Sequence, residues 1–188
     1  MVFFRCSIDL IFRPFATLRA VLNHPHRLAI GFGGLLTLSA VYIVVFSVCL
    51  AKNLPPLTPP VLRIPREEYF AYERFFIMPV AIASTVLMAG IIRLAAGYWN
   101  GKGQFEALFA LLGFIHVIVA IAMGLPDLAL AILGRPFIGP HVFLGTTWYF
   151  LLVVVIVREL ERLSWPKTVA VSFMGALANA AVQFVFTR

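Results

Sequence analysis

The sequence predicts an all-α integral membrane protein, a bundle of five transmembrane helices with an N-terminal amphipathic interfacial helix. The mean hydropathy is +0.97, and 62% of the residues are apolar. Apolar runs of about 20 residues, the length that crosses a bilayer, fill most of the chain. They are Leu28–Ala51, Phe75–Gly97, Phe105–Gly124, Ile138–Val157 and Thr168–Phe186. We therefore expect a cytoplasmic or interfacial segment, residues 1–27, and one transmembrane domain, residues 28–188.

The segment before the first span has the spacing of an amphipathic helix. Its apolar positions step by three and four, and its charged positions fall on the other face. The apolar set is Phe4, Ile8, Ile11, Phe15, Leu18 and Leu22, and the charged set is Arg5, Asp9, Arg13 and Arg19. Pro14 is expected to split the segment into two helices. This pattern predicts a helix lying in the membrane surface, with packing beneath the bundle as the alternative.

In a chain of membrane-spanning helices, the formal net charge of +7 indicates the topology and not nucleic-acid binding. With the N-terminus inside, nine of the fifteen Lys and Arg residues fall on the inner side: Arg5, Arg13, Arg19, Arg27, Arg93, Lys102, Arg158, Arg162 and Lys167. The other six are Lys52, Arg63, Arg66, Arg74, Arg135 and Arg188. Because Lys and Arg gather in cytoplasmic loops, we expect a cytoplasmic N-terminus and an outer C-terminus, with no nucleic-acid partner.

Small residues share one face of the third span with a histidine, a pattern typical of closely packed membrane helices. The face consists of Gly113, His116, Ala120 and Gly124. His116 is expected to point into the bundle near mid-membrane, where it would pack or contact a partner. A haem ligand would need a second histidine at the same depth, and His141 belongs to the outer end of the fourth span. We therefore expect no metal and no cofactor.

Polar residues mark one face of the fifth span: Ser172, Ala176, Asn179 and Gln183. Because Asn and Gln seek partners across helices in lipid, this face is expected to contact the bundle or another subunit. Charged residues near span ends supply two interfacial ion-pair candidates, Arg93 with Glu106 and Asp127 with Arg135. Long side chains at such positions reach the headgroups, so a structural role is expected for them.

The first outer loop contains five prolines between Lys52 and Pro65. This content favours an extended, polyproline-like connector, with a partner-binding loop as the alternative. Cys6 and Cys49 are expected on opposite sides of the membrane and therefore unpaired. None of the common catalytic motifs for hydrolysis, phosphate binding or thiol redox chemistry is present, so we expect no enzyme.

Several segments resemble the bacterial members of the Yip1-domain family of small multispanning membrane proteins. They are the entry Asn23–Arg27, the turn Gly101–Phe105 with its continuation to Phe114, and the hairpin from Trp148 through Leu163, Ser164 and Lys167. The resemblance covers roughly residues 12 to 187. It implies five spans with a cytoplasmic N-terminus, and a bacterial cytoplasmic (inner) membrane. Eukaryotic members contact Rab-type GTPases through features that this chain lacks, so GTPase binding is not carried over.

Together these features predict a non-catalytic membrane scaffold or accessory subunit of a membrane complex. Its expected partners are the lipid bilayer and either another membrane protein or a second copy of the chain. The first alternative is a small transporter or lipid-handling protein with a cavity beside His116. The second alternative is an accessory subunit of a redox or photosynthetic complex.

Overall fold

The computed structural model describes residues 2–56, 64–135 and 139–186 and confirms the predicted fold class. Every regular element in these ranges is helical, and five helical segments are long and apolar enough to cross a membrane. The elements are α1 (Val2–Phe12), α2 (Pro14–Leu22), α3 (Arg27–Ala51), α4 (Tyr69–Tyr98), α5 (Phe105–Phe114), α6 (His116–Val119), η1 (Ala120–Gly124), α7 (Leu125–Ile132), α8 (Pro140–Glu161) and α9 (Trp165–Phe186). Residues 57–63 and the expected span start at Ile138 lie outside the described ranges.

The third span differs from its prediction because it does not end at Gly124. It continues from Phe105 to Ile132 through four consecutive pieces, α5, α6, the π-helical turn η1 and α7. Pro126 lies in the first turn of α7, immediately after η1. In a regular α-helix its ring would clash with the carbonyl four residues back, and the wider turn of a π-helix relieves that clash. The second span, α4, begins at Tyr69, six residues before the apolar run that starts at Phe75.

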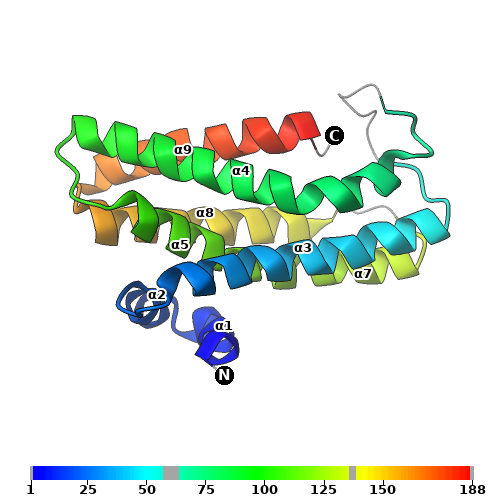
Figure 1. Cartoon of the computed structure of the whole chain (residues 1–188), viewed down its shortest axis with the longest axis horizontal. Coiled ribbons are helices and arrows are strands. Elements are labelled where there is room, and N and C mark those ends of the chain that lie inside the picture. The colour runs from blue at the N-terminus through cyan, green and yellow to red at the C-terminus, as the bar shows by residue number, and fades with distance from the viewer. Residues whose placement is uncertain (1, 57–63, 136–138, 187–188) are drawn as a thin grey trace.

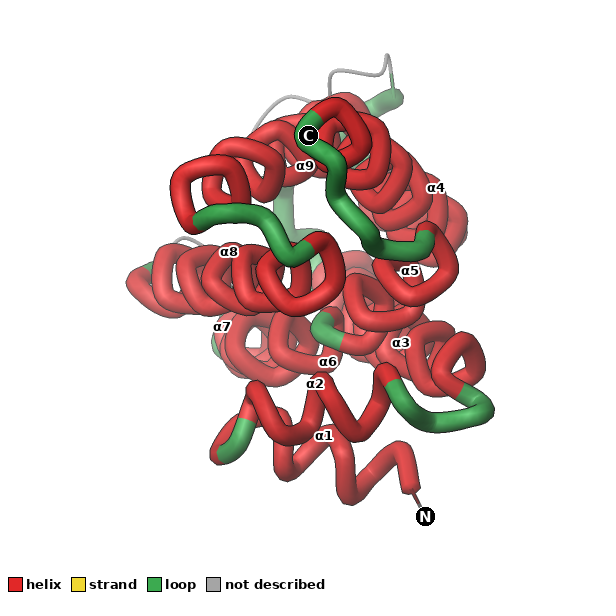
Figure 2. The backbone as a smooth tube through the Cα atoms, turned by 90° about the vertical axis from the view of Figure 1, so that its left-hand side faces the viewer, coloured by secondary structure: helices red, strands yellow, loops and turns green. Residues whose placement is uncertain are grey.

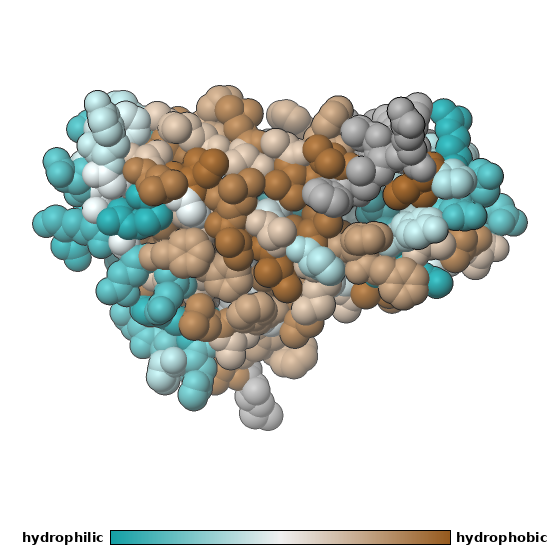
Figure 3. Space-filling view, turned by 45° about the horizontal axis from the view of Figure 1, so that its top comes forward, coloured by the Kyte–Doolittle hydropathy of each residue, from teal (hydrophilic) through white to brown (hydrophobic). Residues whose placement is uncertain are grey.

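The spans run side by side along the long axis of the molecule (Figure 1), and an end view shows the other spans around α5 and α6 (Figure 2). The third span is the core of the bundle, with 72% of its most apolar window buried, whereas the corresponding value for α9 is 22%. A hydrophobic band covers the middle of the molecule, with hydrophilic residues gathered toward both ends (Figure 3). This distribution is that of a protein embedded in a bilayer.

The two ends of the bundle differ in charge. We call the end where α3, α5 and α9 begin, together with α1 and α2, the cationic end. In the described ranges its cations are Arg5, Arg13, Arg19, Arg27, Arg93, Lys102, Arg158, Arg162 and Lys167, and its anions are Asp9, Glu106, Glu159 and Glu161. The opposite end is balanced, with Lys52, Arg66, Arg74 and Arg135 against Glu67, Glu68, Glu73 and Asp127.

Helices α1 and α2 lie across the bundle near the cationic end (Figures 1 and 2). Leu10, Leu18 and Val21 are buried against the bundle. The predicted apolar face is therefore only partly the packing face, because four of its members are exposed: Phe4, Ile8, Ile11 and Phe15. The break between α1 and α2 at Arg13, just before Pro14, gives each helix its own packing face and leaves a second apolar face pointing away from the bundle.

Helices α3 and α5 approach each other backbone to backbone. A Cβ atom added at Gly31 would lie 2.5 Å from the Ala110 carbonyl oxygen, and one added at Gly34 would lie 2.3 Å from that of Gly113. Glycine is required on both helices because no side chain fits between them. This contact fixes the position of the central span in the cationic half of the bundle.

Candidate functional site

A buried polar site joins three helices near the opposite end of the bundle. The Tyr42 hydroxyl of α3 donates a hydrogen bond to Asp127 Oδ2 of α7 at 2.9 Å. The other carboxyl oxygen, Asp127 Oδ1, is 2.8 Å from His141 Nε2 of α8. The Asp127 side chain is only 6% exposed and that of His141 17%. We call Tyr42, Asp127 and His141 the polar triad.

The local structure explains why these side chains meet. Asp127 lies one turn after η1, and the wider π turn changes the direction in which the following residues project. His141 follows Pro140, which occupies the first position of α8, where its missing N–H leaves no helical bond unmade. Tyr42 lies nine residues before the end of α3, so its long side chain reaches Asp127 from deeper in the bundle.

The triad holds one proton between Asp127 Oδ1 and His141 Nε2, in addition to the hydroxyl proton that Tyr42 donates. An ionised Asp127 accepts this proton from the imidazole, whereas a protonated Asp127 donates it. The hydrogen bonds of the triad connect α3, α7 and α8.

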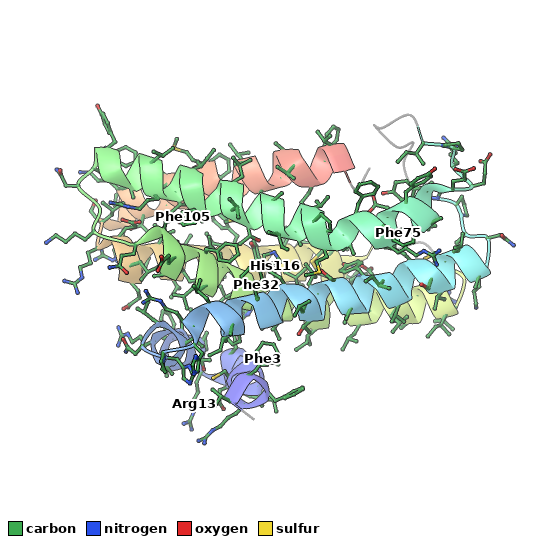
Figure 4. All side chains as sticks on the ribbon, viewed as in Figure 1. Phe3, Arg13, Phe32, Phe75, Phe105 and His116 are labelled. Carbon is green, nitrogen blue, oxygen red and sulfur yellow. The ribbon has the colours of Figure 1, made fainter. Side chains whose placement is uncertain are left out.

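His116 lies near the middle of the bundle (Figure 4), is buried, and does not belong to the triad. Its Nδ1 is 2.8 Å from the Leu112 carbonyl oxygen, so Nδ1 carries the hydrogen. The ring packs edge-on against Tyr149 of α8, with 5.4 Å between centroids. The imidazole therefore donates a hydrogen bond to a backbone carbonyl near the break between α5 and α6. Its ring also packs the central span against α8.

At the cationic end, Glu161 of α8 is buried and caps the turn before α5. Its Oε2 accepts hydrogen bonds from Arg93 Nη1 at 3.0 Å and from the Gly103 backbone N–H at 2.9 Å. A Cβ atom at Gly101 or Gly103 would lie 2.4 Å from a carboxyl oxygen, so both glycines are needed for the turn to enclose Glu161. Arg93 also donates to the Gly101 carbonyl oxygen at 3.2 Å.

Both predicted interfacial ion pairs are wrong. Arg93 pairs with Glu161, while Glu106 is 69% exposed and lies 3.9 Å from Arg27. Glu106 occupies the first turn of α5 and points outward, whereas Arg93 faces the end of α8.

Asp127 lies within α7 and points inward, so it pairs with His141 and not with Arg135. Arg135 follows the end of that helix and is exposed. The continuation of the third span past Gly124 explains this correction, because it moves Asp127 from a loop into a helix.

The predicted packing face of the third span meets two neighbouring helices, α3 and α8. Gly113 faces Gly31 of α3, and Gly124 faces the Val41 side chain of the same helix. Ala120, which lies between these two glycines in the sequence, is buried at the start of η1. The small residues of this face therefore contact α3, whereas His116 turns toward α8.

The polar face of the fifth span packs inside the protein, mainly against α4. Gln183 Nε2 donates to Ser84 Oγ at 3.3 Å. Ser172 is fully buried and Ala176 is half-buried on the same face. In the described ranges, neither Ser172 Oγ nor the buried Asn179 Oδ1 has a hydrogen-bond partner.

Sequence reasoning missed Tyr42, Tyr149 and Glu161, and it did not join His141 to Asp127. Tyr42 and Tyr149 carry no charge, and spacing along one helix does not show which neighbour a side chain reaches. Glu161 stood in a charged segment between spans and therefore looked like an ordinary loop residue. The available signal was the presence of two glycines, Gly101 and Gly103, in a turn that must close around something.

Within the residues that the structure describes, no group of three or more His, Cys, Asp or Glu side chains is placed to hold a metal ion. No family model, curated protein or solved structure matches this chain. The helical bundle and its buried polar contacts are therefore the basis for any functional proposal.

Proposed function

We propose that this protein is a non-catalytic integral membrane scaffold or accessory subunit, and that its partner is another membrane protein or a second copy of the chain. The observation that carries the proposal is the outward face of α9. This helix packs along one side only, mainly on α4, and 22% of its apolar window is buried. The chain therefore presents a whole helix face at the edge of its bundle.

The composition of that face favours another helix as its neighbour. Phe173 and Leu177 are 55% and 54% exposed and lie one turn apart. Ala170 and Ala180 are exposed on the same side of the helix. Small residues between bulky ones permit close approach and knob-into-hole contacts, which drive helix association in lipid.

The experiment is purification of the tagged full chain in a gentle detergent, with total mass, absorption spectrum and bound species recorded together. A stoichiometric protein partner or a defined homo-oligomer supports the proposal. An absorbing pigment on such a complex identifies it as redox or photosynthetic. A monomer without any protein partner overturns the proposal.

Matched variants test the surface itself. Leu177→Ala and Ala180→Leu alter the proposed contact face, and we expect each to lower the recovered partner severalfold. Leu94→Ala changes an outward residue of α4 that is 78% exposed and is the control. Equal loss from all three variants would assign the effect to general destabilisation and count against the α9 surface.

The charge difference between the ends supports an orientation for this proposal. With nine described cations against four anions, the cationic end fits the cytoplasmic side, which places the N-terminus inside and the C-terminus outside. The resemblance to bacterial Yip1-domain proteins favours membership of that family and location in the bacterial inner membrane. Impermeant thiol labelling of single-cysteine variants at Lys102 and Arg135 tests the orientation, because only the outer position should react in intact cells.

A second candidate, a small transporter or lipid-handling protein, is favoured by the irregular central span. Intramembrane ionisable residues and π-helical turns both concentrate at functional sites, and here Asp127 lies one turn after η1. Proteoliposomes with an entrapped pH dye test its proton-conducting form. A proton flux that disappears in Asp127→Asn supports this candidate, and a flux equal to that of empty vesicles overturns it.

A further inference from the structure

A shallow, open cavity at the cationic end is lined by two arginines, and exposed apolar residues of α1 and α2 lie at the same end of the bundle. Arg158, Glu159 and Arg162, from the end of α8 and the residue after it, line this cavity of about 280 Å³. Its charge depends on a residue of α2, because Arg19 donates two hydrogen bonds from one edge of its guanidinium to the Glu159 carboxylate. The distances are 3.2 Å from Nε to Oε2 and 2.8 Å from Nη2 to Oε1.

This two-point contact leaves the cavity positively charged. Arg19 neutralises Glu159, the acidic residue between the two arginines. In the described ranges, neither Arg158 nor Arg162 forms an ion pair with a carboxylate. Arg158 instead stacks over the Trp165 ring, with its Cζ 5.4 Å from the ring centroid. Tryptophan is typical of the membrane interface. Two cationic side chains are thus available to an anion at headgroup depth.

The neighbouring apolar face of α1 and α2 lies alongside the first turns of α3. Phe15 is four residues before Arg19 on α2, so Arg19 borders the apolar face, whereas the sequence pattern predicted it on the opposite face. Phe15 is 57% exposed. Phe4 and Phe12 of α1 are 74% and 77% exposed. Phe3 of α1 packs beside Gly33 of α3. Gly33 is six residues after the start of α3, a distance of about 9 Å along the helix axis. A ligand spanning both regions needs a negative headgroup and hydrocarbon tails.

We propose that this surface binds an anionic phospholipid. The headgroup phosphate lies between Arg158 and Arg162, and the acyl chains lie along the exposed phenylalanines of α1 and α2. Arg19 is a positioning residue that holds α2 against α8 and neutralises Glu159. Charge complementarity selects the occupant, because a zwitterionic lipid offers no net negative charge to offset the two arginines. The inference does not depend on the scaffold proposal.

The test is lipid retention by the full chain in nanodiscs of phosphatidylcholine containing increasing fractions of phosphatidylglycerol. After extraction, native mass spectrometry counts the lipids that stay bound. We expect selective retention of phosphatidylglycerol, weakened by salt. Replacing both arginines, as Arg158→Gln with Arg162→Gln, is expected to lower that retention about thirtyfold, because each basic residue near an anionic membrane contributes a factor of about five.

The matched control is Arg66→Gln with Arg135→Gln, which removes the same charge from the opposite end. Retention that falls equally in both double variants overturns the site and leaves only a net-charge effect. Equal retention of the two lipids also overturns it. Inorganic phosphate that displaces the lipid at millimolar concentration would reassign the arginines to a soluble anion and overturn the lipid proposal. Circular dichroism of each variant confirms that the helical bundle is intact.

Discussion

The two ends of the bundle each bury a carboxylate, but they bind it in different ways. Glu161 is bound by the Gly103 backbone N–H and the Arg93 guanidinium, within a turn that leaves no room for a Cβ atom. Asp127 is bound by the side chains of Tyr42 and His141, contributed by two other helices. A backbone enclosure opens only if the turn itself rearranges, whereas side-chain contacts are lost by a change of rotamer.

The cationic half of the bundle is therefore fixed more firmly than the opposite half. At the cationic end, α3 and α5 also meet backbone to backbone at Gly31 and Gly34. Toward the opposite end, the nearest neighbours of Gly124 are side chains of α3, those of Val41 and Tyr42. We therefore infer a rigid cationic half and an opposite half whose helix contacts depend on side-chain hydrogen bonds.

The largest expected effect is that of Glu161→Ala. It leaves the Gly103 N–H without its acceptor and Arg93 without its counter-ion, and breaking such a buried pair costs about 3 kcal/mol. Reversible unfolding in mixed micelles, followed by tryptophan fluorescence, measures the change in the free energy of unfolding. The control is Glu106→Ala, where the exposed carboxylate contributes at most about 0.5 kcal/mol. Similar losses for the two variants would contradict the enclosure of Glu161.

The next effect is that of Gly34→Ala, where the added methyl group must separate α3 from α5. Overpacking against a backbone that cannot move aside costs about 2 kcal/mol. Gly124→Ala is expected to cost less, because the neighbouring Val41 side chain can shift. Gly90→Ala is the control, since nothing lies within 4 Å of its added Cβ atom, and a better helix former there should stabilise slightly. The same unfolding assay measures the change in the free energy of unfolding for the three variants. A loss for Gly124→Ala as large as that for Gly34→Ala would contradict the difference between the two contacts.

The number of spans and the membrane class could be predicted because lipid imposes a simple requirement on composition and length. The extension of the third span to Ile132 could not, because Leu125, Pro126 and Asp127 look like a helix terminus in sequence. Only the π-helical turn before Pro126 makes continuation possible. Once Asp127 lies in a helix, its partners are set by the arrangement of neighbouring spans.

The same limit explains the incorrect ion pairs. Arg93 and Glu106 are close in sequence across a short turn, and proximity along the chain was the only available guide. The real partner, Glu161, is 68 residues from Arg93 and arrives through the packing of α8. Periodicity gives the face of each helix but not which neighbour that face meets.

A smaller effect is expected for Tyr42→Phe, which removes one hydrogen bond from Asp127 and leaves His141 in place. Hydrogen bonds between membrane helices contribute about 0.6 kcal/mol on average, so the loss should be close to that value. The same unfolding assay measures it, with Tyr98→Phe on an 84% exposed side chain as the control. A loss as large as that of Glu161→Ala would show that the opposite end is fixed as firmly as the cationic end.

The smallest effect compares the two halves without changing a residue, because each half carries one cysteine. Cys6 on α1 is partly buried, and this burial raises the pKa of its thiol above the ordinary value. Less thiolate is then present at a given pH, so alkylation by a maleimide should be slower than for a free thiol, and its rate should level off at a higher pH. Cys49 is fully buried and should react only after unfolding. Reaction of Cys49 in the folded protein, at a rate comparable to that of Cys6, would show that the opposite half opens spontaneously, and the onset of that reaction in Tyr42→Phe alone would attribute the closure to the polar triad.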